Sequence, residues 1–217
     1  MSNVKLVWVT PDAEAMIVDM ARVSAPENQG KSETAPKLLR YLLKNKHISP
    51  FEMANMCVEI NTTRAISPQI LRHRSFSYQE FSLRYSESSK LGSSVMPHLR
   101  RQDIKNRQNS IDDLNAEQVG KYYRRISQLF EDAEHLYKEM TSDGVAKECA
   151  RSILPLSTPT RLYMNGSLRS WITYIALREK NGTQLEHMQI AKEAKEIFCA
   201  QFPIIAEALG GTSPWEI

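Results

Sequence analysis

The stretch Met56-Cys57-Val58-Glu59-Ile60-Asn61 alternates large apolar side chains with smaller or polar ones. Successive side chains of a β-strand point to opposite faces of its sheet, so this alternation predicts a strand with one buried face. Upstream, Leu6-Val7-Trp8-Val9-Thr10 is rich in residues that favour strands and predicts another. The pattern indicates a sheet of few strands.

Helical spacing of apolar residues marks several further segments, with the strongest pattern between Glu117 and Met140. The predicted helices are the segments 13–21, 35–45, 62–72, 117–140, 168–178 and 184–202. Thr62 and Thr63 offer N-caps to the third of these, and Pro68 either kinks that helix or starts a second one. Segment 86–118 lacks periodicity and predicts a long, partly mobile loop. We therefore expect one α/β domain over residues 1–217, in which a small, mostly antiparallel sheet packs with several long helices.

Composition and patterning exclude several classes of protein. The net charge of +3 is too small by itself to indicate a nucleic-acid partner. The start of the chain has no apolar run behind a basic segment, so we expect no signal peptide. No apolar run is long enough to span a membrane, so we expect no membrane partner. The three cysteines are widely spaced and the five histidines are scattered, which predicts a cytoplasmic protein without disulfides or a metal site.

The densest group of functional side chains is Arg72-His73-Arg74-Ser75-Phe76-Ser77-Tyr78-Gln79-Glu80-Phe81-Ser82-Leu83-Arg84-Tyr85. Arginine forks match phosphate oxygens and stay charged when partly buried, and serine hydroxyls can add hydrogen bonds. Gln69 and Gln79 offer amide groups for the edge of a heterocycle. The combination suits a ligand that is planar at one end and anionic at the other. Two alternatives remain open on these residues alone: a solvated polar face, and a platform on which single-stranded nucleic acid stacks.

The spacing within this stretch resembles that of the flavin-dependent thymidylate synthases. Arg72-His73-Arg74, then seven residues, then Ser82, is the signature motif of that family. Three further elements match in order: His47-x-Ser49-x-x-Glu52, Ala150-Arg151-x-x-Leu154-Pro155, and Leu177-Arg178 followed by Gln184-x-Glu186. The resemblance spans residues 4–205. It implies reductive methylation of dUMP to dTMP, with methylene-tetrahydrofolate as carbon donor and FAD, recharged by NADPH, as hydride carrier. It also implies a homotetramer whose sites are shared between subunits.

The resemblance further implies which residues bind the ligands. For dUMP they are Gln69, Arg72, Glu80, Ser82, Arg84, Arg151 and Arg178. For FAD they are Ser49, Arg72, His73, Arg74, Glu80, Ser167, Arg169 and Thr173. Ser167 and Thr173 stand where many members have asparagine, although each keeps a hydroxyl that can hydrogen-bond. The long loop after Tyr85 receives no site residue.

Arg178 is the expected catalytic residue, because a guanidinium near the pyrimidine can stabilise negative charge that develops on the ring. The three cysteines, Cys57, Cys149 and Cys199, lie outside any ligand-like motif and are expected to be small buried hydrophobes, not nucleophiles. Ser82 has no evident histidine–acid relay, so we expect it to bind substrate. A metal-dependent nucleotide hydrolase is disfavoured, because the sequence has no cluster of aspartates and histidines.

Overall fold

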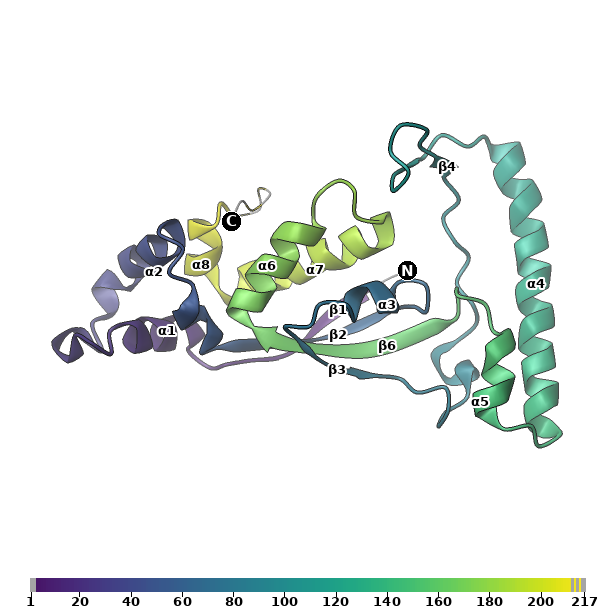
Figure 1. The fold of residues 1–217 in the computed structure, drawn as a ribbon, viewed down its shortest axis with the longest axis horizontal. Helices are drawn as coiled ribbons and strands as arrows, with labels where there is room; N and C mark the ends of the chain where they lie inside the picture. Colours follow the sequence, from purple (N-terminus) through teal and green to yellow (C-terminus); the bar gives the residue numbers. More distant parts are fainter. Residues whose placement is uncertain (1–2, 212, 214, 216–217) are drawn as a thin grey trace.

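A four-stranded antiparallel sheet forms the middle of an elongated molecule in the computed structural model, which describes residues 3–211, 213 and 215 (Figure 1). Its strands are β1 (Asn3–Val9), β2 (Asn55–Thr63), β3 (Ser77–Glu80) and β6 (Pro159–Ser167), in the order β1-β2-β6-β3. A separate antiparallel pair joins β4 (Arg101–Gln102) to β5 (Ser110–Ile111). Positions 1, 2, 212, 214, 216 and 217 of the expected domain lie outside the described residues.

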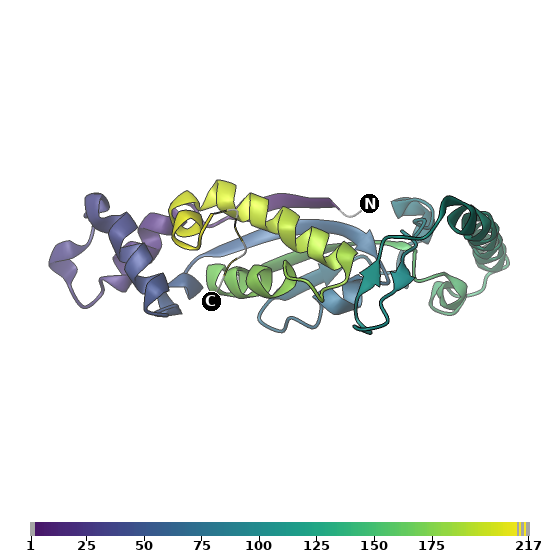
Figure 2. The same ribbon diagram turned by 90° about the horizontal axis from the view of Figure 1, so that it is seen from above.

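Helices cover one face of the sheet and occupy both ends of the molecule. They are α1 (Ala13–Ala21), α2 (Ala35–Lys44), α3 (Ser67–Ile70), α4 (Ala116–Ser142), α5 (Lys147–Ala150), α6 (Leu168–Arg178), α7 (Leu185–Gln201) and α8 (Pro203–Ala208). Helices α6 and α7 lie over the sheet, α1 and α2 lie at one end, and α4 and α5 lie at the other (Figures 1 and 2). None of the helices in the described ranges is long and apolar enough to cross a membrane.

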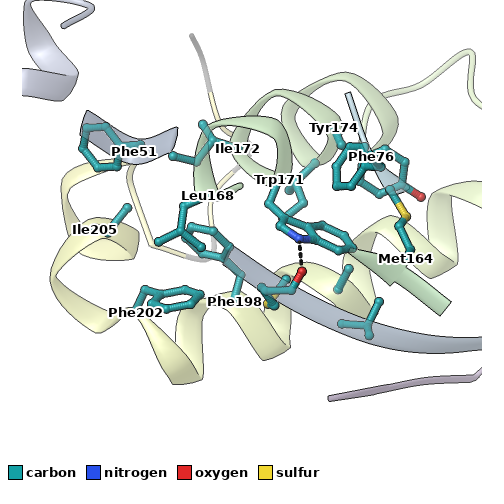
Figure 3. Close-up of a cluster of buried hydrophobic side chains, with 14 of the residues drawn as sticks. Phe51, Phe76, Met164, Leu168, Trp171, Ile172, Tyr174, Phe198, Phe202 and Ile205 are labelled. Atoms are coloured by element: carbon teal, nitrogen blue, oxygen red, sulfur yellow. Dashed lines mark hydrogen bonds between the residues drawn. The ribbon is translucent and has the colours of Figure 1, made fainter. Parts of the chain in front are cut away.

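The core forms where α6 and α7 pack on the buried face of the sheet. Met56, Val58 and Ile60 of β2 are buried on that face, as the alternation predicts. Trp171 of α6 is wholly buried and donates a hydrogen bond from its indole N–H to the Met56 carbonyl at 2.8 Å (Figure 3). Its ring therefore ties α6 to the central strand. The expected α/β architecture with a small antiparallel sheet is confirmed.

The prediction that Thr62 and Thr63 cap a helix is wrong. Both residues end β2, where they pair with Thr160 and Pro159 of β6. Threonine suits a strand as well as a cap because its branched side chain packs against neighbours on a pleated sheet. The helix is a single short turn, α3, which begins at Ser67 with a proline in its first turn.

Strands β3 and β6 and the short helix α8 were not anticipated from the sequence. In β6, Thr160, Leu162, Met164 and Gly166 are buried in alternation, which is a strand pattern. Segment 86–118 is largely irregular, as expected, but it also contains the β4–β5 hairpin and a 3₁₀ turn at Ser88–Leu91.

Helix α4 is confirmed, yet its apolar stripe is only partly covered by the described chain. Tyr137 is its one buried residue. Leu129 is 61% exposed, and Tyr122 and Leu136 are also exposed. Figure 1 shows α4 at the end of the molecule, packed beside α5 and remote from the main core.

Gly166 provides a test of the packing between the sheet and α6. A Cβ at this position would lie 2.4 Å from Cδ1 of Phe76, whose ring packs edge-on against Trp171. We expect Gly166→Ala to lower the free energy of unfolding by about 1–3 kcal/mol, because the ring must move within a filled core. Urea denaturation measures the change.

The matched control is Gly120→Ala, in the second turn of α4. A Cβ there has no atom within 4 Å, so the change should raise stability by about 0.5–1 kcal/mol through helix propensity. A Gly166→Ala protein as stable as the wild type would contradict the close approach of Phe76 to the strand.

Candidate functional site

Arg178 and His73 meet at the C-terminal end of α6. Nε of Arg178 donates a hydrogen bond to Nε2 of His73 at 2.9 Å. The turn that carries His73 is held by Tyr78, whose hydroxyl lies 2.9 Å from the Ile70 carbonyl and 3.0 Å from the His73 carbonyl. Strand β3 therefore fixes the turn after α3, and the turn presents His73 to Arg178.

His73 is neutral in this arrangement. Burial, and next the positive charge of Arg178, lower the pKa of His73 to about 4. Because Nε2 accepts a hydrogen bond, the ring proton of the neutral form must lie on Nδ1. The hydrogen bond therefore holds Nε of the Arg178 guanidinium in a fixed direction.

A chain of polar contacts lies on the segment just after Arg178. Gln69 donates from its amide to Gln184 Oε1 at 2.7 Å, and Gln184 donates to Glu186 Oε2 at 3.0 Å. Arg100 clamps both oxygens of Glu186, at 2.8 and 3.1 Å. Arg100 comes from the long loop after Tyr85, in which the sequence predicts no site residue. Nothing in the sequence distinguishes Arg100 from its neighbour Arg101. The loop thus contributes to holding the Gln184–Glu186 segment.

Three arginines of the predicted site have no side-chain partner among the described residues: Arg72, Arg74 and Arg151. Arg84 pairs with Glu148 at 3.0 Å, but both side chains are more than half exposed, so that pair is weak. Guanidinium groups without carboxylate partners are available for phosphate oxygens. This set of donors fits the phosphates that the resemblance implies.

A second group of predicted site residues lies at the N-terminal end of α6. Ser167 caps the helix by accepting from the Ser170 N–H at 3.3 Å. Arg169 forms an ion pair with Glu52, the last residue of the 3₁₀ turn that begins at Ser49. Thr173 lies one turn further along and donates to the Arg169 carbonyl at 3.1 Å. Arg169 and Thr173 are exposed on the same side of α6, as their spacing of four residues requires.

A single chain does not bring all the predicted residues together. Glu80 is enclosed between Arg64 at 3.1 Å and the Thr160 hydroxyl at 2.8 Å. Ser82 is exposed beyond the end of β3, and Arg151 directly follows α5. Figure 1 places α5 toward the end of the molecule that carries α4, away from α6. The predicted site residues therefore fall into separate groups along the length of one subunit.

The aromatic residues of the Arg72–Tyr85 stretch do not form a stacking platform. Phe76 is buried against Trp171 and Tyr174. Tyr78 is partly buried and donates its hydroxyl to the backbone. Tyr85 alone among them is strongly exposed, at 87%. Binding of single-stranded nucleic acid by stacking needs several exposed rings, so these contacts argue against that alternative.

The cysteines differ from the expectation in one respect. Cys57 is buried and Cys199 is partly buried, and burial raises the pKa of both thiols. Cys149 is exposed, so the prediction that it is a buried hydrophobe is wrong; it lies on the outer side of the short helix α5. Within the described ranges there is no cluster of three or more histidine, cysteine or acidic residues that could hold a metal ion.

Comparison with known proteins agrees with these features. Residues 5–204 match the family model described as thymidylate synthase complementing protein. A flavin-dependent thymidylate synthase from Synechocystis sp. is 51% identical, over 90% of this chain and 89% of that protein. A probable flavin-dependent thymidylate synthase of Paramecium bursaria Chlorella virus 1 is 50% identical, over 91% of this chain and 90% of that protein.

A solved structure has the same fold. The crystal structure of the UMP/dUMP methylase PolB from Streptomyces cacaoi, bound with 5-Br dUMP, superposes with a TM-score of 0.85. The two chains share 25% sequence identity, and the match covers 99% of this chain and 97% of that one. The family model and the two relatives span nearly all of the chain. The chain therefore belongs to the flavin-dependent thymidylate synthase family.

Proposed function

We propose that the protein methylates dUMP to dTMP with methylene-tetrahydrofolate as carbon donor and FAD, recharged by NADPH, as hydride carrier. Its family membership makes it a methyltransferase with a flavin cofactor. The observation that carries the proposal is the Arg178–His73 hydrogen bond at the end of α6. His73 stands between Arg72 and Arg74, which have no side-chain partner among the described residues. We place the reaction in the cytoplasm, since all three cysteines are free thiols.

The proposed dUMP site uses cationic groups for the phosphate and amide or carboxylate groups for the nucleoside. Its members are Gln69, Arg72, Glu80, Ser82, Arg84, Arg151 and Arg178. Arg72 and Arg151 have no side-chain partner within the part of the chain that the structure describes, which supports this assignment because the monophosphate would neutralise them. In the UMP/dUMP methylase of Streptomyces cacaoi the same fold holds a brominated dUMP.

The proposed FAD site uses the exposed side of α6 together with the Arg72–Arg74 turn. Its members are Ser49, Arg72, His73, Arg74, Glu80, Ser167, Arg169 and Thr173. Hydroxyl and guanidinium donors suit the pyrophosphate and ribose of FAD, and Leu177, 54% exposed and one turn beyond Thr173, offers an apolar surface. When bound, the flavin supplies hydride transfer between NADPH and the methylated base. His73, neutral and fixed by Arg178, can donate from Nδ1 without adding charge.

We further propose that each site is completed by residues of different subunits in a homotetramer. Within one chain Arg84 pairs with Glu148 of α5, whereas Arg72 lies next to α3. The exposed apolar side chains of α4 offer a surface that a second copy would cover.

Two variants test the shared site. Arg72→Ala and Arg84→Ala should each be inactive alone, because each removes a phosphate partner from every site. Hybrid oligomers of the two should regain activity, since some sites then draw an intact Arg72 and an intact Arg84 from different chains. Each variant mixed with itself is the control. Hybrids that are demonstrably mixed yet remain inactive would contradict sharing.

The proposed donors are tested by omission. dTMP formation from dUMP should need both NADPH and methylene-tetrahydrofolate, each left out in turn. Product formed without methylene-tetrahydrofolate would overturn the proposed carbon donor, and product formed over many turnovers without NADPH would overturn the proposed reductant.

A further inference from the structure

Behind His73 lies a buried pair formed by Tyr174 of α6 and His187 of α7. His187 is wholly buried and Tyr174 is 1% exposed. His187 Nε2 lies 3.1 Å from the Tyr174 hydroxyl. The pair joins the two helices directly beneath the turn that carries His73.

The three rings pack so that each restricts the others. The His73 and Tyr174 rings meet edge-on, with centroids 4.8 Å apart and planes at 85°. The His73 and His187 rings are 6.2 Å apart at 81°. Phe76 closes the cluster from the side of β3, with its centroid 5.8 Å from that of Tyr174. The plane of the His73 ring is therefore set by Tyr174 and His187, and that plane sets the direction in which Nε2 accepts from Arg178.

The Tyr174–His187 pair is uncharged, so it can fix the position of its neighbours but adds no charge to the site. Burial, followed by the charge of Arg178, lowers the pKa of His187 to about 4, so the imidazole is neutral under physiological conditions. Nδ1 of His187 has no partner among the described residues. A neutral histidine and a tyrosine bring two donor protons, and their single hydrogen bond uses one of them. Keeping such an incompletely satisfied polar pair in the core is costly compared with two apolar residues, which indicates a role beyond packing.

We propose that His187, acting through Tyr174 and His73, is a positioning residue that orients the Arg178 guanidinium toward the substrate. This inference rests on the proposed role of Arg178. The proposal adds a residue of α7 to the site. It joins residues from three parts of the chain: the turn after α3, helix α6 and the start of α7.

The test compares His187→Leu with His187→Gln, and each with Tyr174→Phe. Leucine removes the hydrogen bond, whereas glutamine keeps an amide N–H for the Tyr174 hydroxyl. We expect His187→Leu and Tyr174→Phe each to lower kcat by about tenfold, the effect of one displaced hydrogen bond in an active site. KM for dUMP and the bound flavin content should change much less. His187→Gln should restore most of the rate.

The double variant His187→Leu/Tyr174→Phe tests whether the two residues act on kcat through one another or independently. If His187 acts through Tyr174, the double variant is no slower than the slower single variant. If the fold-losses in kcat of the two single variants multiply in the double variant, the proposal is overturned. Equal losses in the leucine and glutamine variants would overturn it too, because they indicate packing alone.

Tyr137→Phe is the matched control. Tyr137 is buried in α4 and lies outside the site, so the change removes a buried hydroxyl without touching the site. Its loss should leave kcat unchanged. If His187→Leu does not fold, the test rests on Tyr174→Phe, and a normal kcat in that variant overturns the inference. Wild-type protein and Arg178→Ala are assayed in parallel. If the wild type forms dTMP and Arg178→Ala is slow, a normal kcat in Tyr174→Phe counts against this inference and not against the proposed function.

Discussion

Replacing Arg178 with alanine should lower kcat for dTMP formation by about 10²–10³, while FAD remains bound. An oriented positive charge that meets negative charge developing on the pyrimidine contributes about this much to a rate. Arg178 is oriented because it is the last residue of α6 and because His73 accepts from its Nε at 2.9 Å. Steady-state kinetics at saturating dUMP, together with the flavin content of the purified variant, measures the effect.

Arg178→Lys separates charge from geometry. Lysine keeps the positive charge but lacks the planar fork that reaches both His73 and a substrate, so kcat should stay well below the wild-type value. An arginine that merely complements the dipole of α6 would affect stability alone, by about 0.3–1 kcal/mol. A near-normal kcat in Arg178→Ala would therefore assign this residue to binding or stability and remove it from catalysis.

Replacing Lys195 with methionine should lower the free energy of unfolding by about 3–5 kcal/mol, because a buried carboxylate is left without its cation. Lys195 Nζ lies 2.8 Å from Oε2 of Glu179, and the two side chains are only 7% and 6% exposed. The same ammonium donates to the Ser213 carbonyl at 2.6 Å, and the Trp215 N–H donates to Glu179 Oε1 at 2.7 Å. Glu179 directly follows Arg178, so the pair also secures the end of α6 that carries the proposed catalytic residue.

Two further variants make the Lys195 prediction specific. Arg40→Met removes an ion pair with Glu207 whose side chains are 48% and 66% exposed, and it should cost no more than about 1 kcal/mol. Adding Glu179→Gln to Lys195→Met should recover part of the loss, since no unpaired buried charge then remains. Chemical denaturation measures all three proteins. A Lys195→Met protein within 1 kcal/mol of the wild type would contradict burial of the pair.

The sequence predicted those elements whose patterns are long or unambiguous. The alternation of residues 56–61 identified β2, and helical spacing identified α2, α4 and α7. Strand β6 was not predicted because the residues that alternate with its buried positions are mixed in character: Arg161, Tyr163 and Asn165. Strand β3 has four residues and lies inside the stretch that was interpreted as a ligand site. Thr62 and Thr63 were misassigned because local propensity does not distinguish a cap from the end of a strand, and pairing with β6 decides it.

Parts of the site depend on contacts that no local pattern contains. Arg178 and His73 were each predicted, but they are 105 positions apart, so their hydrogen bond follows from the fold alone. Arg100 was missed because its partner, Glu186, lies 86 positions further along the chain. His187 was regarded as one of several scattered histidines, and its burial against Tyr174 comes from the packing of α6 on α7. Sequence motifs therefore supplied the residues that we propose to bind the ligands, whereas the residues that support them required the structure.

The most direct test of the proposed function is dTMP formation from dUMP before and after removal of the flavin. The purified protein is stripped of FAD, assayed with dUMP, NADPH and methylene-tetrahydrofolate, and assayed again after FAD is added back. The proposed function predicts no dTMP from the stripped protein and recovery of activity with FAD. Formation of dTMP at an undiminished rate by the flavin-free protein would contradict it.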